Sequence, residues 1–145
     1  MTSSGRIQEG LGYIEKTIVR RDNEGFRACA DWCRTYLCEV YLNILSGDGE
    51  ASLGLFLRNF QALSWVMMFG SKRIETLIEH VRSNPQFDPN GHYIGRAEMI
   101  LGLLYKAKKK KALAVEHLSE ARRIAGAFGP SPMLTRIEAA LAELD

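Results

Sequence analysis

The chain has 145 residues, of which 46% are hydrophobic and 25% charged, so it can bury a core without disulfides or metals. Its 19 Lys and Arg residues nearly balance its 17 Asp and Glu residues, which excludes a histone-like or strongly acidic protein. Cys29, Cys33 and Cys38 are the three cysteines, and an odd number within ten residues favours reduced thiols in the cytoplasm over the disulfides of a secreted protein. Neither a secretory signal nor a membrane span is predicted, because no apolar run is long enough.

Apolar residues recur every three or four positions along nearly the whole chain, and no proline occurs before Pro85, so the sequence predicts an all-α fold. Turn residues and lysines separate the expected helices, including a break at Gly70-Ser71, and Ser131-Pro132 is a typical helix start. The expected helices, in chain order, are residues 7–22, 26–45, 51–69, 74–81, 94–105, 113–128 and 131–144.

The third expected helix is apolar on most of its circumference, and Arg58 is its one charged residue. Such a helix is either buried on several sides or offers one face to a partner. Self-association of two copies through the helix 51–69 is therefore one hypothesis, with four candidate contact residues: Leu55, Trp65, Val66 and Phe69.

The last third of the chain carries the tetratricopeptide repeat (TPR) pattern. Leu101-Gly102-x-x-Tyr105 is followed by Ala114-x-x-x-Leu118-x-x-Ala121, although Glu98 stands where the pattern usually has tryptophan. The small residues of this pattern lie where paired helices approach closely, and an echo at Leu37-Cys38-x-x-Tyr41 lies about two repeats upstream.

These repeats predict a right-handed antiparallel helix-hairpin solenoid, TPR-like and of about seven helices, in a single domain over residues 1–145. Within it we expect an irregular hairpin at 51–83, the best TPR repeat at 95–128 and a polar capping helix at 131–144. Residues 5–22 resemble the second helix of a repeat whose first helix is missing, so we expect the chain to be the C-terminal piece of a longer protein.

Three runs carry a narrower resemblance: Asn84-Pro-Gln-Phe-Asp-Pro-Asn-Gly-His92, the lysine-ended helix from Gly95 to Lys111 with Ala112–Ala121, and Phe128-Gly-Pro-Ser-Pro132. The chain resembles, over its whole length, the C-terminal helical-repeat region of bacterial class III adenylate/guanylate cyclases of the rhizobial type. The resemblance implies a regulatory or docking tail in cAMP signalling. It does not imply cyclase activity, because nothing in the chain matches the paired aspartates that hold the metal ions in the catalytic domain.

No pattern in the sequence indicates a phosphate site, a metal or a cofactor. Gly47-Asp48-Gly49 lacks the Gly-Lys-Ser/Thr of a phosphate-binding loop. Cys29 and Cys33 are four apart on a helix, but no second pair of ligands at metal spacing accompanies them. We therefore predict neither a metal site nor a cofactor.

The titratable residues also form no recognisable catalytic constellation. His80, His92 and His117 are widely separated and are expected at cap, loop and surface positions. The carboxylate pairs Glu75/Glu79 and Glu116/Glu120 are expected on solvated helix faces, with Glu120 paired to Arg123. No catalytic residue is predicted, and the chain is not expected to be an enzyme.

Two further surfaces are candidates for binding. If Gly102 faces the partner helix of its own repeat, four residues turn toward the concave side where TPR arrays hold peptides: Arg96, Met99, Leu103 and Lys106. Either a short apolar peptide with acidic flanks or the chain's own helix 51–69 would fill this groove.

The second surface is the lysine cluster at the following turn: Lys106, Lys108, Lys109, Lys110 and Lys111. Its charge suits a solvated turn, an acidic protein segment, another anionic ligand or nucleic acid, although no aromatic residue is interleaved for base stacking.

The sequence as a whole predicts a cytoplasmic, non-catalytic module for protein–protein interaction or regulation. Its partner would be another domain of the parent chain or a separate regulator. The alternatives are a homodimerisation module and, more distantly, nucleic-acid or anionic-ligand binding through the lysine cluster.

Overall fold

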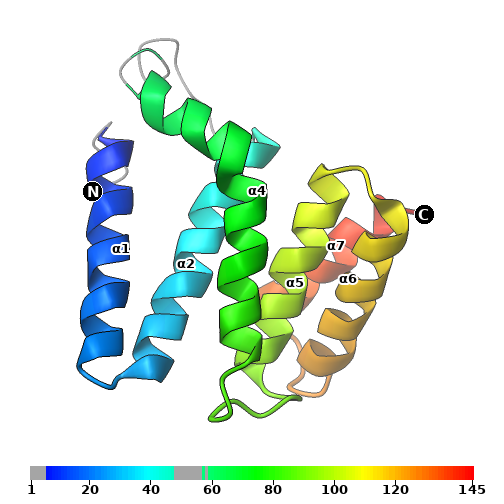
Figure 1. Ribbon diagram of the computed structural model, residues 1–145. Coiled ribbons are helices and arrows are strands. Elements are labelled where there is room, and N and C mark those ends of the chain that lie inside the picture. The colour runs from blue at the N-terminus through cyan, green and yellow to red at the C-terminus, as the bar shows by residue number, and fades with distance from the viewer. Residues whose placement is uncertain (1–5, 48–56, 58) are drawn as a thin grey trace. The chain divides into compact units, whose positions relative to one another are not determined.

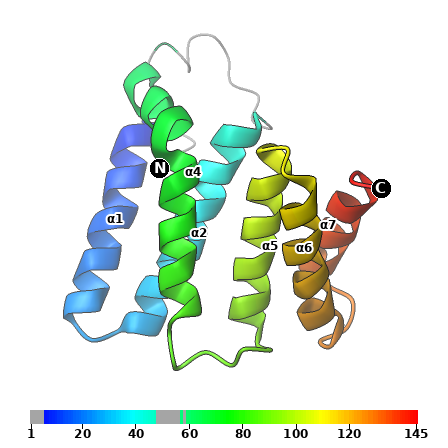
Figure 2. The same ribbon diagram turned by 45° about the vertical axis from the view of Figure 1, so that its right-hand side comes forward.

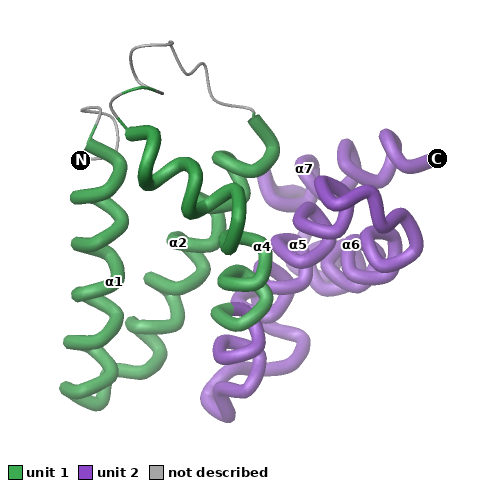
Figure 3. The backbone as a smooth tube through the Cα atoms, turned by 45° about the horizontal axis from the view of Figure 1, so that its top comes forward, with its two compact units in different colours: residues 1–77 green, residues 78–145 purple. Residues whose placement is uncertain are grey.

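The computed structural model describes residues 6–47, 57 and 59–145, and this part of the chain contains helices and no strand. The predicted all-α class is therefore confirmed. The chain divides into two compact units, residues 1–77 and residues 78–145, which are coloured separately in Figure 3. The single domain expected over residues 1–145 stays a prediction.

The first unit begins with a hairpin of two helices, α1 (Ile7–Asn23) and α2 (Arg27–Ser46), which lie side by side in Figure 1. Gly25 in the connection has a φ of 80°, and Gly47 ends α2 with a φ of 71°. Glycine adopts this left-handed backbone without the Cβ clash that other residues incur. The predicted limits of both helices are confirmed.

The next helix, α4 (Phe60–Arg82), runs without interruption through Gly70 and Ser71. The predicted break at Gly70-Ser71 is therefore wrong. A Cβ on Gly70 would lie 2.9 Å from Val66 Cγ1 of the same helix and in ordinary van der Waals contact, 3.6 Å, with Leu45 Cδ1 of α2. The start of the third predicted helix, including Leu55, lies outside the described residues.

Large apolar side chains from the described helices of the first unit are fully or nearly fully buried. They include Ile18 from α1, Leu37 and Tyr41 from α2, and Val66 and Ile74 from α4. The Cys38 thiol of α2 lies 4.0 Å from the Ile74 carbonyl oxygen of α4, so these two helices meet at that point.

The second unit contains three further helices, α5 (His92–Ala107), α6 (Lys111–Gly126) and α7 (Pro132–Ala142), which Figure 2 shows next to one another. A Cβ on Gly102 of α5 would lie 2.5 Å from Leu118 Cγ and 3.0 Å from the Leu118 backbone nitrogen of α6. The predicted close approach of the paired helices at Gly102 is therefore confirmed. Ser131 caps α7, since its hydroxyl accepts a 3.1 Å hydrogen bond from Leu134 N, as the sequence predicts.

Within the described part of the chain, every helix is too short or too polar to cross a membrane.

Candidate functional site

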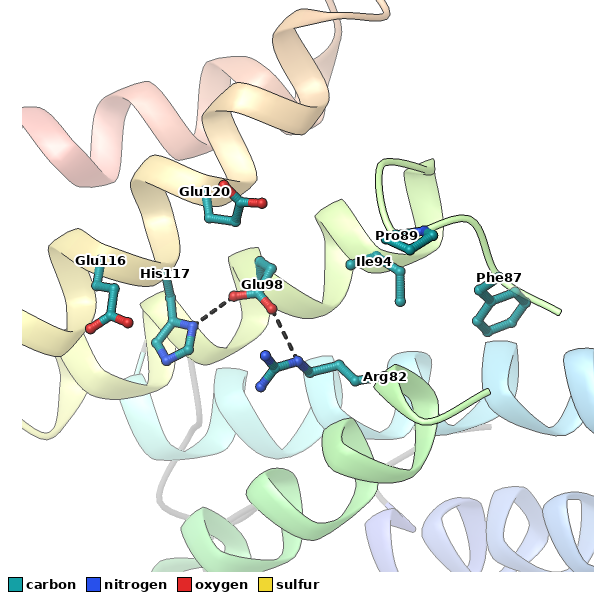
Figure 4. Close-up of a pocket in the computed structure, with 8 residues that line it drawn as sticks. All are labelled: Arg82, Phe87, Pro89, Ile94, Glu98, Glu116, His117 and Glu120. Atoms are coloured by element: carbon teal, nitrogen blue, oxygen red, sulfur yellow. Dashed lines mark hydrogen bonds and ion pairs between the residues drawn. The ribbon is translucent and has the colours of Figure 1, made fainter. Parts of the chain in front are cut away.

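A pocket of about 370 Å³ lies in the second unit, and all of its lining residues belong to that unit (Figure 4). Its polar side chains come from three helices: Arg82 from the end of α4, Glu98 from α5, and Glu116, His117 and Glu120 from α6. Its apolar wall is formed by Phe87 and Pro89, from the loop before α5, and Ile94 from the first turn of α5.

Glu98 is the central group of the pocket, and only 5% of this residue is exposed. His117 Nδ1 lies 2.6 Å from Glu98 Oε2, a hydrogen bond in which the imidazole donates to the carboxylate. Arg82 Nε forms an ion pair with Glu98 Oε1 at 3.1 Å. Figure 4 shows both basic side chains turned toward Glu98. Both carboxylate oxygens are thus engaged, as a buried carboxylate requires.

The imidazole of His117 is held on its other side by an aromatic neighbour. Its ring stacks on the ring of Tyr105, with centroids 5.4 Å apart and planes 20° apart. His117 was expected at a surface position, and this expectation is wrong because its side chain is only 15% exposed. Packing between α5 and α6 therefore fixes the orientation of the imidazole.

Glu120 lies at the rim of the pocket and pairs with Arg123, as the sequence predicts. Arg123 Nε and Nη2 donate to the two Glu120 carboxylate oxygens at 2.9 and 2.7 Å. The hydrogen bonds from Arg123 lower the pKa of Glu120, so this carboxyl stays ionised at neutral pH. Arg123 Nη2 also donates to Asn90 Oδ1 at 2.7 Å, which ties α6 to the loop before α5.

The predicted concave groove is only partly open in the structure. Met99 is 3% exposed and is therefore a packing residue rather than an open contact. Arg96 and Leu103 are half-buried, and Lys106 Nζ forms an ion pair with Glu143 Oε2 at 2.5 Å. The structure thus does not bring these four residues together on an exposed surface.

The lysine cluster lies where α5 turns into α6, and four of its members are exposed: Lys108, Lys109, Lys110 and Lys111. Lys108 Nζ lies 5.7 Å from the centroid of the Tyr105 ring, and Lys109 has a φ of 57° within the turn. The charge of Lys106 is balanced by Glu143 of α7. Nucleic-acid or anion binding by this cluster stays a prediction.

The predicted self-association residues are divided between core and surface. Val66 is fully buried, so it cannot contact a second copy, whereas Trp65 and Phe69 are 42% and 50% exposed. Their rings lie 5.9 Å apart, and the Trp65 ring also lies 6.0 Å from the Tyr41 ring of α2. Leu55, the fourth predicted residue, lies outside the described residues.

The three cysteines are free thiols at different depths: Cys29 is exposed, Cys33 is intermediate and Cys38 is buried. Burial raises the pKa of the Cys38 thiol to about 12, and burial together with neighbouring Cys29 raises the pKa of Cys33. Among the described residues, no three His, Cys, Asp or Glu side chains come together as possible metal ligands.

Sequence reasoning missed the pocket because its residues are far apart in the chain. Arg82, Glu98 and His117 belong to three helices, and no spacing within one helix connects them. The available signal was Glu98 itself, a carboxylate at a position where the repeat pattern usually has a large apolar residue. A charged residue in such a position needs partners from neighbouring helices.

Comparison with known proteins gives no relative from which a function could be transferred. No protein-family model, curated protein or solved structure matches the chain.

Proposed function

We propose that the chain is a non-catalytic protein-binding module of the TPR-like helical-repeat type, acting in the cytoplasm. In this proposal it resembles the C-terminal tail of a class III nucleotidyl cyclase and serves cAMP signalling by docking another domain of the parent chain or a regulator. The contact between Gly102 and Leu118 supports the TPR-like part, because that pattern places small residues where paired helices meet.

The observation that carries the binding proposal is an exposed apolar face on α4, formed by Trp65, Met68 and Phe69. Met68 and Phe69 follow Trp65 by one helical turn, and Met68 is 73% exposed. From Phe60 to Ser71 the helix contains no charged residue. Aromatic and methionine side chains without nearby charge are typical of the centre of protein interfaces. We refer to these three residues as the α4 apolar face.

Contacts within the first unit hold this face in place before any partner binds. The Trp65 ring packs against Tyr41, which is buried in α2, and against Phe69. An aromatic anchor that is already ordered loses little conformational entropy on binding, so more of its burial energy contributes to affinity.

A second copy of the chain is the alternative partner, and the absence of charge on this segment of α4 favours it. A two-fold interface brings the same surface of both copies together, so any charge near the axis would meet a like charge. The α4 apolar face carries no such charge. In that case the tail would pair two parent chains.

Light scattering over a wide concentration range tests the alternative, using the wild type, Trp65→Glu and Met68→Glu. Trp32→Glu is the matched control, because Trp32 is 49% exposed in the same unit and stacks on Tyr36 of α2. A dimer that both α4 variants dissociate and the control retains supports homodimerisation. A monomer at every concentration overturns that alternative.

Selection of displayed peptides on the immobilised chain tests binding of a different protein. We expect the selected peptides to carry apolar anchors and to lose at least about tenfold in affinity on Trp65→Glu and Met68→Glu, the loss typical of an interface anchor. Trp32→Glu should bind them like the wild type. If no peptide is selected and the chain is monomeric, or if the selected peptides bind all variants equally, the proposed function is wrong.

A further inference from the structure

The pocket of the second unit shares no residue with the α4 apolar face, which belongs to the first unit. Its two basic side chains are already engaged, because Arg82 and His117 both bind the same buried carboxylate, Glu98. An anionic ligand would have to compete with Glu98 for them. The pocket is therefore poorly suited to phosphate or to a carboxylate ligand.

Among the three glutamates that line the pocket, by contrast, one negative charge has no positive partner. Glu98 is balanced by Arg82, and Glu120 is balanced by Arg123 at the rim. Within the described residues, Glu116 forms no hydrogen bond or ion pair, and it lies one helical turn from Glu120 on the same side of α6 (Figure 4). The lining thus has room for one positive charge beside Glu116.

The opposite end of the pocket is apolar. Ile94, Pro89 and Phe87 lie away from the carboxylates of α6 in Figure 4. The Phe87 ring is held by stacking on Tyr93, with centroids 4.6 Å apart and planes 14° apart. A volume of about 370 Å³ falls within the range of pockets that hold small organic molecules or a single side chain.

From this arrangement we infer that the pocket binds an organic monocation, an ammonium or guanidinium group attached to a short apolar body. The positive group pairs with Glu116, and the apolar body packs against Ile94 and Phe87. Glu98 does not pair with the ligand. Its two carboxylate oxygens hold His117 and Arg82 in position. The inference does not depend on what binds the α4 apolar face.

Three probes with the same aromatic body but different charge test this inference: phenethylammonium, neutral 2-phenylethanol and anionic 3-phenylpropionate. Binding to the full chain is followed by the amide NMR signals of Glu98, Glu116, His117 and Glu120. We expect phenethylammonium to shift these signals and to bind at least about fivefold more tightly than the alcohol, which corresponds to about 1 kcal/mol for one ion pair. The anion should not bind.

Two variants check that the carboxylate of Glu116 is responsible. Glu116→Gln keeps the shape of an exposed side chain and should weaken phenethylammonium binding by about fivefold. Glu138→Gln on α7, also exposed and outside the pocket, should leave the affinity unchanged. The inference is overturned if no probe shifts these signals, if the alcohol or the anion binds as tightly as the ammonium, or if Glu116→Gln has no effect.

The same titration with acetyl-lysyl-phenylalanine amide identifies the source of the cation. Binding that is tighter than that of phenethylammonium and is weakened by Glu116→Gln indicates a lysine side chain of a peptide. Binding of phenethylammonium without binding of the peptide indicates a free amine. Either result supports the shared chemistry of the site.

Discussion

Arg34 shows how much one side chain contributes to the first unit. It is nearly buried and pairs with Asp31 of its own helix through a 2.6 Å hydrogen bond from Nη1 to Oδ1, while Nη2 binds Asp22 of α1. Asp31 is completely buried. The ion pair of Arg34 with Asp22 therefore links the two helices of the hairpin by charge, in addition to apolar packing.

We expect Arg34→Ala to lower the free energy of unfolding by about 3–5 kcal/mol, because the buried Asp31 carboxylate loses its closest partner. Arg34→Ala combined with Asp31→Ala should cost less than the sum of the two single changes, since the double variant leaves no buried charge at this position. Urea denaturation followed by circular dichroism measures all three variants. Strictly additive changes would show that the two side chains do not interact.

The buried thiol of Cys38 makes the free energy of unfolding decrease at alkaline pH. Burial raises its pKa to about 12, whereas a thiol in an unfolded chain ionises near about 8.5. The unfolded chain therefore releases this proton first, and the stabilisation present below about pH 8.5 is lost as the pH rises toward 12. Tyr41 acts in the same direction, because burial and neighbouring Glu15 raise its pKa.

We expect the free energy of unfolding to fall between about pH 8.5 and pH 12, and Cys38→Ala to make that fall shallower. Cys29→Ala at an exposed position is the control: it removes the contribution of Cys29 to the raised pKa of Cys33, but should keep the fall that Cys38 causes. Urea denaturation at several pH values in this window gives the slopes. Identical slopes for Cys38→Ala and the wild type would contradict the assignment.

At the scale of elements, two glycines within helices should respond oppositely to the same substitution. Gly102→Ala would place its Cβ 2.5 Å from Leu118 Cγ and 3.0 Å from the Leu118 backbone nitrogen, where only the side chain can move away. We expect it to destabilise the chain by about 1–3 kcal/mol through overpacking of α5 against α6.

Gly12→Ala in α1 is the matched comparison, because its Cβ would meet nothing within 4 Å. We expect it to stabilise the chain by about 0.5–1 kcal/mol, since alanine loses less backbone entropy in a helix. Thermal unfolding of both variants beside the wild type gives the two signs. Destabilisation by Gly12→Ala, or a neutral Gly102→Ala, would contradict the packing described for these helices.

Helix ends are the part of the structure that local sequence patterns predict best. The C-terminal end of α2 and the start of α7 are predicted correctly, because Gly47 and Ser131 act through their own backbone and capping geometry. Gly70 gave a wrong prediction, because it lies within a continuous helix, against Val66 of the same helix and Leu45 of α2. Local signals fix helix ends, whereas a glycine within a helix has to be interpreted from its tertiary neighbours.

At the scale of the whole molecule, the sequence does not predict which face of an apolar helix is buried and which is exposed. Met99 and Val66 belong to helices that are apolar nearly all round, so periodicity alone could not decide which side is buried. Both were assigned to binding surfaces and both are core residues. The pocket around Glu98 was missed for a related reason, since it needs three helices to be placed together before its residues meet.

The helix α4 belongs to both compact units: residues 60–77 lie in the first and residues 78–82 in the second. A segment as short as 78–82 does not form a stable helix in isolation, because nucleation requires several residues to be ordered for each hydrogen bond gained. Arg82, which pairs with Glu98 in the pocket, lies at the end of this helix. Any protease cut or engineered boundary near Leu77 would therefore divide a continuous helix rather than a linker.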